Sequence, residues 1–135
     1  MTQIKTFLMF SGERHGKAEE AINFYVARFR NSRIDSLRRH GPGEGESEGT
    51  VLMATFTLNG QQFMGMDSAA PHAFNFTPSV SLFVECETEE EIASLFESLA
   101  EAGQVLMALD KYGSSRRFGW LNDRFGVSWQ LNLAA

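Results

Sequence analysis

The sequence predicts an α+β fold built from two similar β-α-β-β-β modules of mostly antiparallel strands. Residues 50–67 and 116–133 each form an apolar and aromatic hairpin around a polar turn. An amphipathic helix pattern precedes each hairpin. The two copies repeat after about 70 residues, which is too long for a solenoid repeat. We therefore expect a duplicated module within one domain that spans residues 1–135.

The first module is predicted over residues 5–67. Its helix, Ala18–Phe29, has apolar residues at helical spacing, and Glu19 and Glu20 in its first turn favour the helix dipole. Asn59 and Gly60 form the dipeptide typical of a two-residue hairpin turn. The expected strands are, in order, Lys5–Phe10, Arg33–His40, Thr50–Leu58 and Gln61–Asp67.

The second module is predicted over residues 79–133. Thr88 and Glu91 have the spacing of a capping box at the start of a helix, and Gly103 is expected to end that helix. In the last strand, the apolar residues Trp129, Leu131 and Leu133 alternate with polar ones. The expected strands are Ser79–Cys86, Gln104–Asp110, Phe118–Leu121 and Val127–Leu133.

Each predicted sheet has one face covered by its helix, so we expect the other faces to line a shared cleft. Strand alternation selects six cleft-lining positions. Twelve Phe and six Met residues suit an aromatic core, and they also suit an apolar cavity. The six positions are Met53, Thr55, Met64, Ser81, Phe83 and Gln130.

Composition and charge exclude several classes of partner. The net charge of −5 and the scattered arginines argue against a nucleic-acid surface. No apolar run approaches the roughly 18 residues that span a membrane, and the first residues lack a signal-peptide pattern. The single cysteine, Cys86, excludes an internal disulfide and suits a reducing compartment, so a cytoplasmic location is expected.

Four segments carry a resemblance to a known family. They are Phe7–Phe10, Ala18–Tyr25, Ala54–Gly60 and Gly119–Gln130. With the paired modules, they make the chain resemble the vicinal oxygen chelate (glyoxalase and bleomycin-resistance) superfamily. More narrowly, it is similar to PhnB-like proteins, some of which are labelled 3-demethylubiquinone-9 3-methyltransferases. The resemblance implies a glyoxalase-like open barrel or cleft.

The metal enzymes of that superfamily carry His, Gln or Glu ligands on the first, fifth and eighth strands. Matching these positions implies Lys5 or Thr6, then Val80 or Ser81, and then Gln130. Where many PhnB-like relatives have a third-strand His, this chain has Met53. Only Gln130 resembles a ligand, and an amide oxygen without carboxylate or imidazole companions holds a metal weakly. We therefore expect no metal and no cofactor.

Other polar candidates have two interpretations each. His15, His40 and His72 fall in predicted loops without metal-ligand spacing, which favours exposed side chains. Asp67 and Glu85 end strands of different modules, so they are either an acid–base pair or solvated strand ends.

Two further features suggest chemistry and are better explained by structure. Cys86 has no basic neighbour in the sequence, which favours a buried thiol over a nucleophile. The loop Gly41–Gly49 lacks the glycine spacing of phosphate-binding loops and carries acidic residues. A glycine-rich turn between a strand and a helix, which a nucleotide-like cofactor would need, is also missing.

Three functional hypotheses remain open. The first is a protein that binds a small lipophilic or aromatic molecule without metal. The second is an enzyme, either a metal-assisted isomerase, lyase or dioxygenase, or a methyltransferase. The third is a structural, dimeric module with no ligand. The resemblance also implies a homodimer, in which Lys5–Phe10 and Ala18–Phe29 are the expected contributors.

Overall fold

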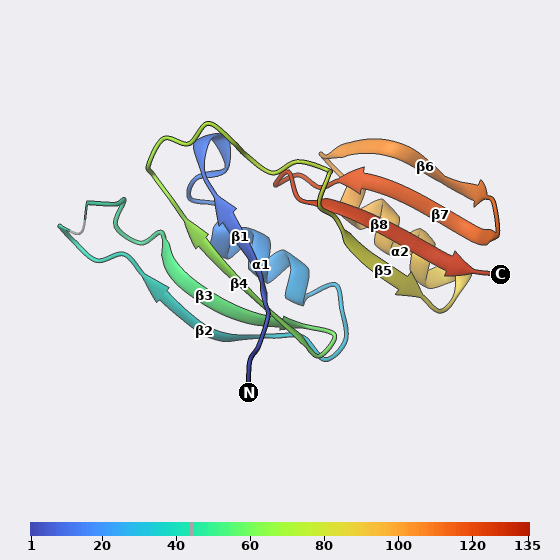
Figure 1. Cartoon of the computed structure of the whole chain (residues 1–135), viewed down its shortest axis with the longest axis horizontal. Coiled ribbons are helices and arrows are strands. Elements are labelled where there is room, and N and C mark those ends of the chain that lie inside the picture. The colour runs from blue at the N-terminus through green and yellow to red at the C-terminus, as the bar shows by residue number, and fades with distance from the viewer. Residues whose placement is uncertain (44) are drawn as a thin grey trace. The chain divides into compact units, whose positions relative to one another are not determined.

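The computed structural model describes residues 1–43 and 45–135, and the chain divides into two compact units, Met1–Asn75 and Phe76–Ala135. Each unit contains one four-stranded sheet and one α-helix (Figure 1). This is the predicted pair of β-α-β-β-β modules. Within the described residues, no helix is long and apolar enough to cross a membrane.

The first unit has the strand order β1-β4-β3-β2. Strand β1 pairs with β4 in parallel, and the other two pairs are antiparallel. A short 3-10 helix, Gly12–Arg14, lies between β1 and α1. The elements are β1 (Thr6–Phe10), α1 (Ala18–Val26), β2 (Arg33–Arg39), β3 (Val51–Leu58) and β4 (Gln61–Asp67).

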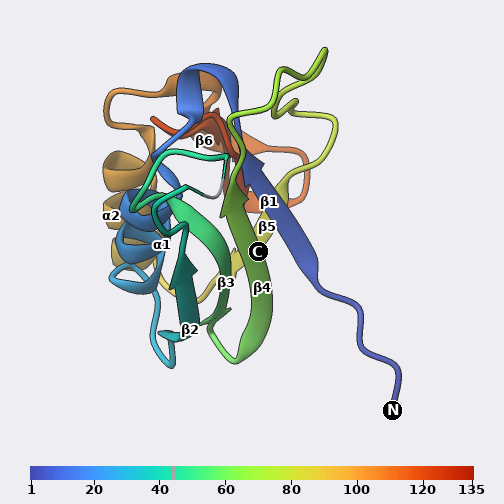
Figure 2. The ribbon, with the colours of Figure 1, turned by 90° about the vertical axis from the view of Figure 1, so that its left-hand side faces the viewer.

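Helix α1 covers one face of this sheet (Figure 2). Its buried residues include Ile22, whose side chain lies against Gly65 in the middle of β4. The β3–β4 turn is the predicted one, because Asn59 and Gly60 both have positive φ angles, 48° and 84°. The helix ends at Val26, three residues earlier than predicted. The loop Gly41–Gly49 joins β2 to β3, and its residue 44 lies outside the described residues.

The second unit repeats the topology with the order β5-β8-β7-β6. Here β5 and β8 are parallel neighbours, and the other pairs are antiparallel. Helix α2 packs on one face of the sheet, with Ile92, Leu95 and Leu99 buried. The elements are β5 (Leu82–Cys86), α2 (Glu89–Ala100), β6 (Gln104–Tyr112), β7 (Ser115–Asn122) and β8 (Ser128–Ala134).

The capping box predicted for α2 is present. The Glu91 amide donates to Thr88 Oγ1 at 3.0 Å, and the Glu87 amide donates to Glu91 Oε1 at 2.7 Å. Strand β5 begins at Leu82, later than the predicted Ser79. The residues before it form a turn, in which the Val80 amide donates to the Thr77 carbonyl at 3.3 Å.

Candidate functional site

Each sheet has a second face that the helix of its own unit does not cover, and we call this the open face. In β4, the residues turned toward α1 are buried and those between them are half-buried. The same alternation runs through Met53–Phe56 of β3 and Trp129–Leu133 of β8. The six predicted site residues are found on or beside these open faces, three in each unit.

In the first unit, the structure brings together Met53, Thr55 and Met64. Thr55 and Met64 are direct cross-strand partners, and Met53 lies two residues before Thr55 on the same side of β3. All three side chains are half-buried. Phe7 of β1 lies opposite Met64 on the other side and is 44% exposed. The result is a continuous strip of thioether, hydroxyl and aromatic groups.

In the second unit, the structure brings together Ser81, Phe83 and Gln130. Phe83 and Gln130 are cross-strand partners in β5 and β8. The Gln130 amide Nε2 donates to Ser81 Oγ at 2.7 Å. Phe83 is 54% exposed, and its ring centroid lies 6.4 Å from that of Phe118. An aromatic surface therefore lies beside an oriented amide.

Several further residues on these faces are not among the six predicted positions. In the first unit, Met9 and Met66 are direct partners in β1 and β4, and Arg38 is opposite Met53. In the second unit, Trp120 is the partner of Gln130 and donates its indole N–H to Ser128 Oγ at 2.9 Å. Strict two-residue alternation along β1, β4 and β7 would have identified all of them except Arg38, whose strand has an irregular register.

The positions that correspond to the superfamily's metal ligands hold poor donors in this chain. Two of them, Ser81 and Gln130, are neighbours in space, but the contact between them is a hydrogen bond from amide to hydroxyl. The third-strand position holds the thioether of Met53. Among the described residues, no group of three or more His, Cys, Asp and Glu side chains could hold a metal ion. Neither the Ser81 and Gln130 pair in the second unit nor Met53 in the first supplies the donors that Zn²⁺ or Fe²⁺ prefers.

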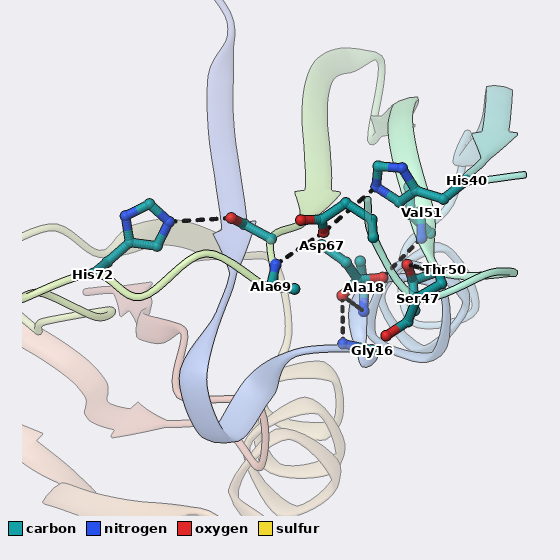
Figure 3. A network of polar contacts seen from close by, with 11 residues as sticks. Gly16, Ala18, His40, Ser47, Thr50, Val51, Asp67, Ala69 and His72 are labelled. Atoms are coloured by element: carbon teal, nitrogen blue, oxygen red, sulfur yellow. Dashed lines mark hydrogen bonds and ion pairs between the residues drawn. The ribbon is translucent and has the colours of Figure 1, made fainter. Parts of the chain in front are cut away.

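The start of α1 also offers little to an anionic cofactor, because a carboxylate of the chain itself already binds it. Asp67 is 1% exposed at the end of β4. Its Oδ1 accepts hydrogen bonds from the Gly16 and Ala18 amides at 2.8 and 3.1 Å, and its Oδ2 accepts one from the Val51 amide at 2.9 Å (Figure 3). Asp67 is therefore a structural anchor, and both predictions for it, acid–base catalysis and solvation, are wrong.

The partner considered for Asp67 has a different environment. Glu85 is exposed on the open face of the second unit, where its Oε1 accepts a hydrogen bond from Asn132 Nδ2 at 2.8 Å. Solvation is the correct prediction for this residue. Cross-strand pairing with β8 then fixes the direction of the carboxylate.

The prediction that all three histidines are exposed is wrong for His40, which is 6% exposed. The loop after β2 folds back, so that the Gly49 amide donates to the His40 carbonyl at 2.9 Å. His40 Nε2 lies 3.7 Å from Glu46 Oε1, which accepts a hydrogen bond from the Ala69 amide (Figure 3). His72 is exposed and shares a 3.1 Å hydrogen bond with Ser68.

Cys86 is the buried thiol that the sequence favours. It is 8% exposed at the end of β5. Burial, with the nearby Glu91 and Glu85 carboxylates, raises the pKa of the Cys86 thiol to about 12. The thiolate form is therefore scarce at neutral pH, which removes Cys86 from the candidate nucleophiles.

Two solved structures of low sequence identity share the fold of this chain. A glyoxalase-related enzyme from Fulvimarina pelagi is 17% identical with a TM-score of 0.60, covering 98% of this chain and 88% of that chain. The fosfomycin resistance protein FosX from Listeria monocytogenes is 10% identical with a TM-score of 0.64, covering 100% and 94%. At these identities the likeness concerns the fold alone, and it agrees with the predicted glyoxalase-like fold.

Closer comparisons then identify the family. The family model described as 3-demethylubiquinone-9 3-methyltransferase matches residues 2–132. A PhnB protein from Bacillus cereus is 56% identical with a TM-score of 0.93, covering 98% of this chain and 100% of that chain. The chain therefore belongs to the 3-demethylubiquinone-9 3-methyltransferase family of PhnB-like proteins, as its sequence segments predict. Among curated proteins, none matches.

Proposed function

We propose that the chain binds a small lipophilic or aromatic molecule on its open sheet faces and that it does so without a metal ion. One observation carries the proposal. Phe7 and Phe83 occupy corresponding places in β1 and β5, and both rings remain on the surface, 44% and 54% exposed. Phe7 lies beside Met64, and Phe83 lies beside Phe118, and contiguous exposed apolar patches are typical of binding surfaces.

The polar groups around these rings support recognition of a ligand with few hydrogen-bonding groups. In the second unit, the N–H of the Gln130 amide is bound to Ser81. Its carbonyl oxygen accepts no hydrogen bond from the described residues, and the side chain lies on the same side as Phe83 and Trp120. An apolar surface with one oriented amide fits a molecule that offers a ring and a single donor.

The neutral lipophilic dye Nile red tests the proposal directly. We expect saturable binding with a rise in fluorescence, and weaker binding after Phe7→Ser or Phe83→Ser. Phe74→Ser is the matched control, because Phe74 is 63% exposed but belongs to the connection after β4 and to neither sheet. Equal effects of all three substitutions, or no saturable binding, would contradict the proposal.

An enzyme is the second candidate, because the description of the family names methyl transfer. Titration with S-adenosylmethionine, followed by calorimetry, tests this candidate. Saturable binding of that cofactor would favour it over simple ligand binding. Elemental analysis of protein purified without chelator is the parallel test, and stoichiometric metal would overturn the metal-free part of the proposal.

We also propose that the chain forms a homodimer in the cytoplasm. Strand β1 is an edge strand of its sheet, so only one of its two sides pairs with another strand of that sheet. The exposed Phe7 on this strand adds apolar surface that association would cover. Light scattering at micromolar concentration decides the point, since the chain alone is 15.1 kDa. A mass about twice that value would support the dimer, and a monomer mass would end the proposal.

A further inference from the structure

Four side chains form one row across the open face of the first unit. Met9 of β1 is the direct partner of Met66 in β4. Continuing the β3–β4 register one step beyond Ala54 and Gly65 places Met53 opposite Met66. On its other side, Met53 is the partner of Arg38 in β2. Three thioethers therefore lead to one guanidinium.

The face on which the Arg38 side chain lies follows from its neighbours in β2 and β3. Arg39 reaches α1, where its Nη2 lies 2.6 Å from Glu19 Oε2, so the Arg39 side chain lies on the helix-covered face. Cross-strand pairing with Met53 places the Arg38 side chain on the open face. Its side chain is exposed, and no hydrogen bond or ion pair from the described residues engages its guanidinium.

The nearest carboxylate of the same strand, Asp35, is engaged elsewhere. It accepts hydrogen bonds from Thr57 Oγ1 at 2.6 Å and from Arg33 Nε at 2.8 Å. Arg38 therefore places a positive charge at its end of the row. Three thioethers alone would suit a soft cation such as Cu⁺, but a guanidinium next to Met53 repels a cation and attracts an anion.

We propose that this row binds an apolar carboxylate, with the carboxylate paired to Arg38 and the hydrocarbon part lying on Met53, Met66 and Met9. The inference deepens the proposed function and rests on it. Methionine side chains adapt their shape to an apolar group, and a guanidinium pairs with a carboxylate through two parallel hydrogen bonds. With strands about 4.8 Å apart, the row spans roughly 14 Å, enough for a molecule of two rings.

The test uses two probes that differ in charge, biphenyl-4-carboxylate and biphenyl-4-carboxamide. Chemical shifts of the methionine methyl groups, assigned by substitution, report binding at the row. We expect the carboxylate to bind more tightly than the carboxamide. Arg38→Gln should weaken carboxylate binding by about tenfold or more and leave carboxamide binding within about twofold. Arg30→Gln is the matched control, because Arg30 is also exposed but lies before β2.

The two ideas fail in different ways. If both probes shift the methionine signals with equal affinity and Arg38→Gln changes neither, the carboxylate inference is wrong and the proposed lipophilic binding stands. If neither probe shifts these signals, binding at this face is wrong, and the inference fails with it. Equal weakening by Arg30→Gln would also overturn the assignment to Arg38.

Discussion

The indole Nε1–H of Trp129 donates a hydrogen bond to Asp123 Oδ2 at 2.8 Å, and both side chains are buried. Asp123 lies in the turn between β7 and β8. Its Oδ1 also accepts hydrogen bonds from the Phe125 and Val127 amides at 2.8 and 3.0 Å. One carboxylate thus fixes the turn and anchors the largest side chain in the core of the second unit.

Asp123→Asn should therefore destabilise the protein strongly. The new amide group offers only one acceptor oxygen, and its N–H₂ faces either Trp129 or the turn amides. We expect a loss of about 2–4 kcal/mol in the free energy of unfolding, measured by urea denaturation. Asp110→Asn is the control, since Asp110 is exposed on β6. A loss below about 0.5 kcal/mol for Asp123→Asn would contradict the anchoring role.

Gly119→Ala should destabilise the second unit through overpacking. A Cβ at this position of β7 would overlap the ring of Phe96 in α2. We expect a cost of about 1–3 kcal/mol. Phe96→Leu removes the edge of the ring, so the double variant should recover part of that cost. Simple additivity of the two substitutions would show that the contact does not limit this position.

The thiol of Cys86 should react only after unfolding. Because its pKa is raised to about 12, the native protein should be inert to Ellman's reagent at pH 8 and react fully in denaturant. The raised value also predicts an alkaline dependence. The neutral thiol contributes fully to the free energy of unfolding below its ordinary pKa of 9.0. That contribution is lost as the pH rises toward the raised pKa of about 12. Cys86→Ala should remove this part of the dependence, and an unchanged alkaline profile would refute it.

Thr57→Val should raise the pKa of Asp35. The hydrogen bond from Thr57 is the main reason that the pKa of this carboxyl lies below its ordinary value, with Arg33 adding a smaller effect. The ionised carboxylate of Asp35 contributes to the free energy of unfolding above pH 3.8. This contribution is lost as the pH falls through the lowered pKa. Carboxyl ¹³C shifts measure the change. Thr55→Val, on the same strand, should leave the Asp35 titration where it is.

Local patterns predicted most of the fold. The dipeptide Asn59-Gly60 and the spacing of Thr88 and Glu91 identify a turn and a helix start from neighbouring residues alone, and both are confirmed. The alternation in β8 correctly predicted which side of Trp129 and its neighbours is buried. The predicted start of β5 at Ser79 was too early, because the residues around Val80 form a turn. A backbone hydrogen bond from Val80 to Thr77 holds this turn, and a pattern of side chains does not reveal such a bond.

Local sequence patterns did not predict the buried polar residues Asp67 and His40. Asp67 binds amides that are 49 and 51 positions away in sequence, and no local pattern marks a carboxylate for that role. His40 is buried by a loop whose path depends on Gly49. On the open faces, alternation found Met53, Thr55 and Met64. It could not place Arg38, because irregular register in β2 hides which side an isolated residue faces.

Because the Ala18 amide donates a hydrogen bond to Asp67, the helices of the two units are stabilised at their starts in different ways. Helix α2 carries its cap in its own first turn, so its start can be stabilised as soon as residues 88–91 are coiled. The start of α1 can be stabilised only after β4 has formed. The Asp67 carboxylate, which accepts the hydrogen bond from the Ala18 amide, comes 49 residues later in the sequence. In native hydrogen exchange, the amides of Gly16, Ala18 and Val51 should lose protection in one step, since a single excursion of Asp67 releases all three.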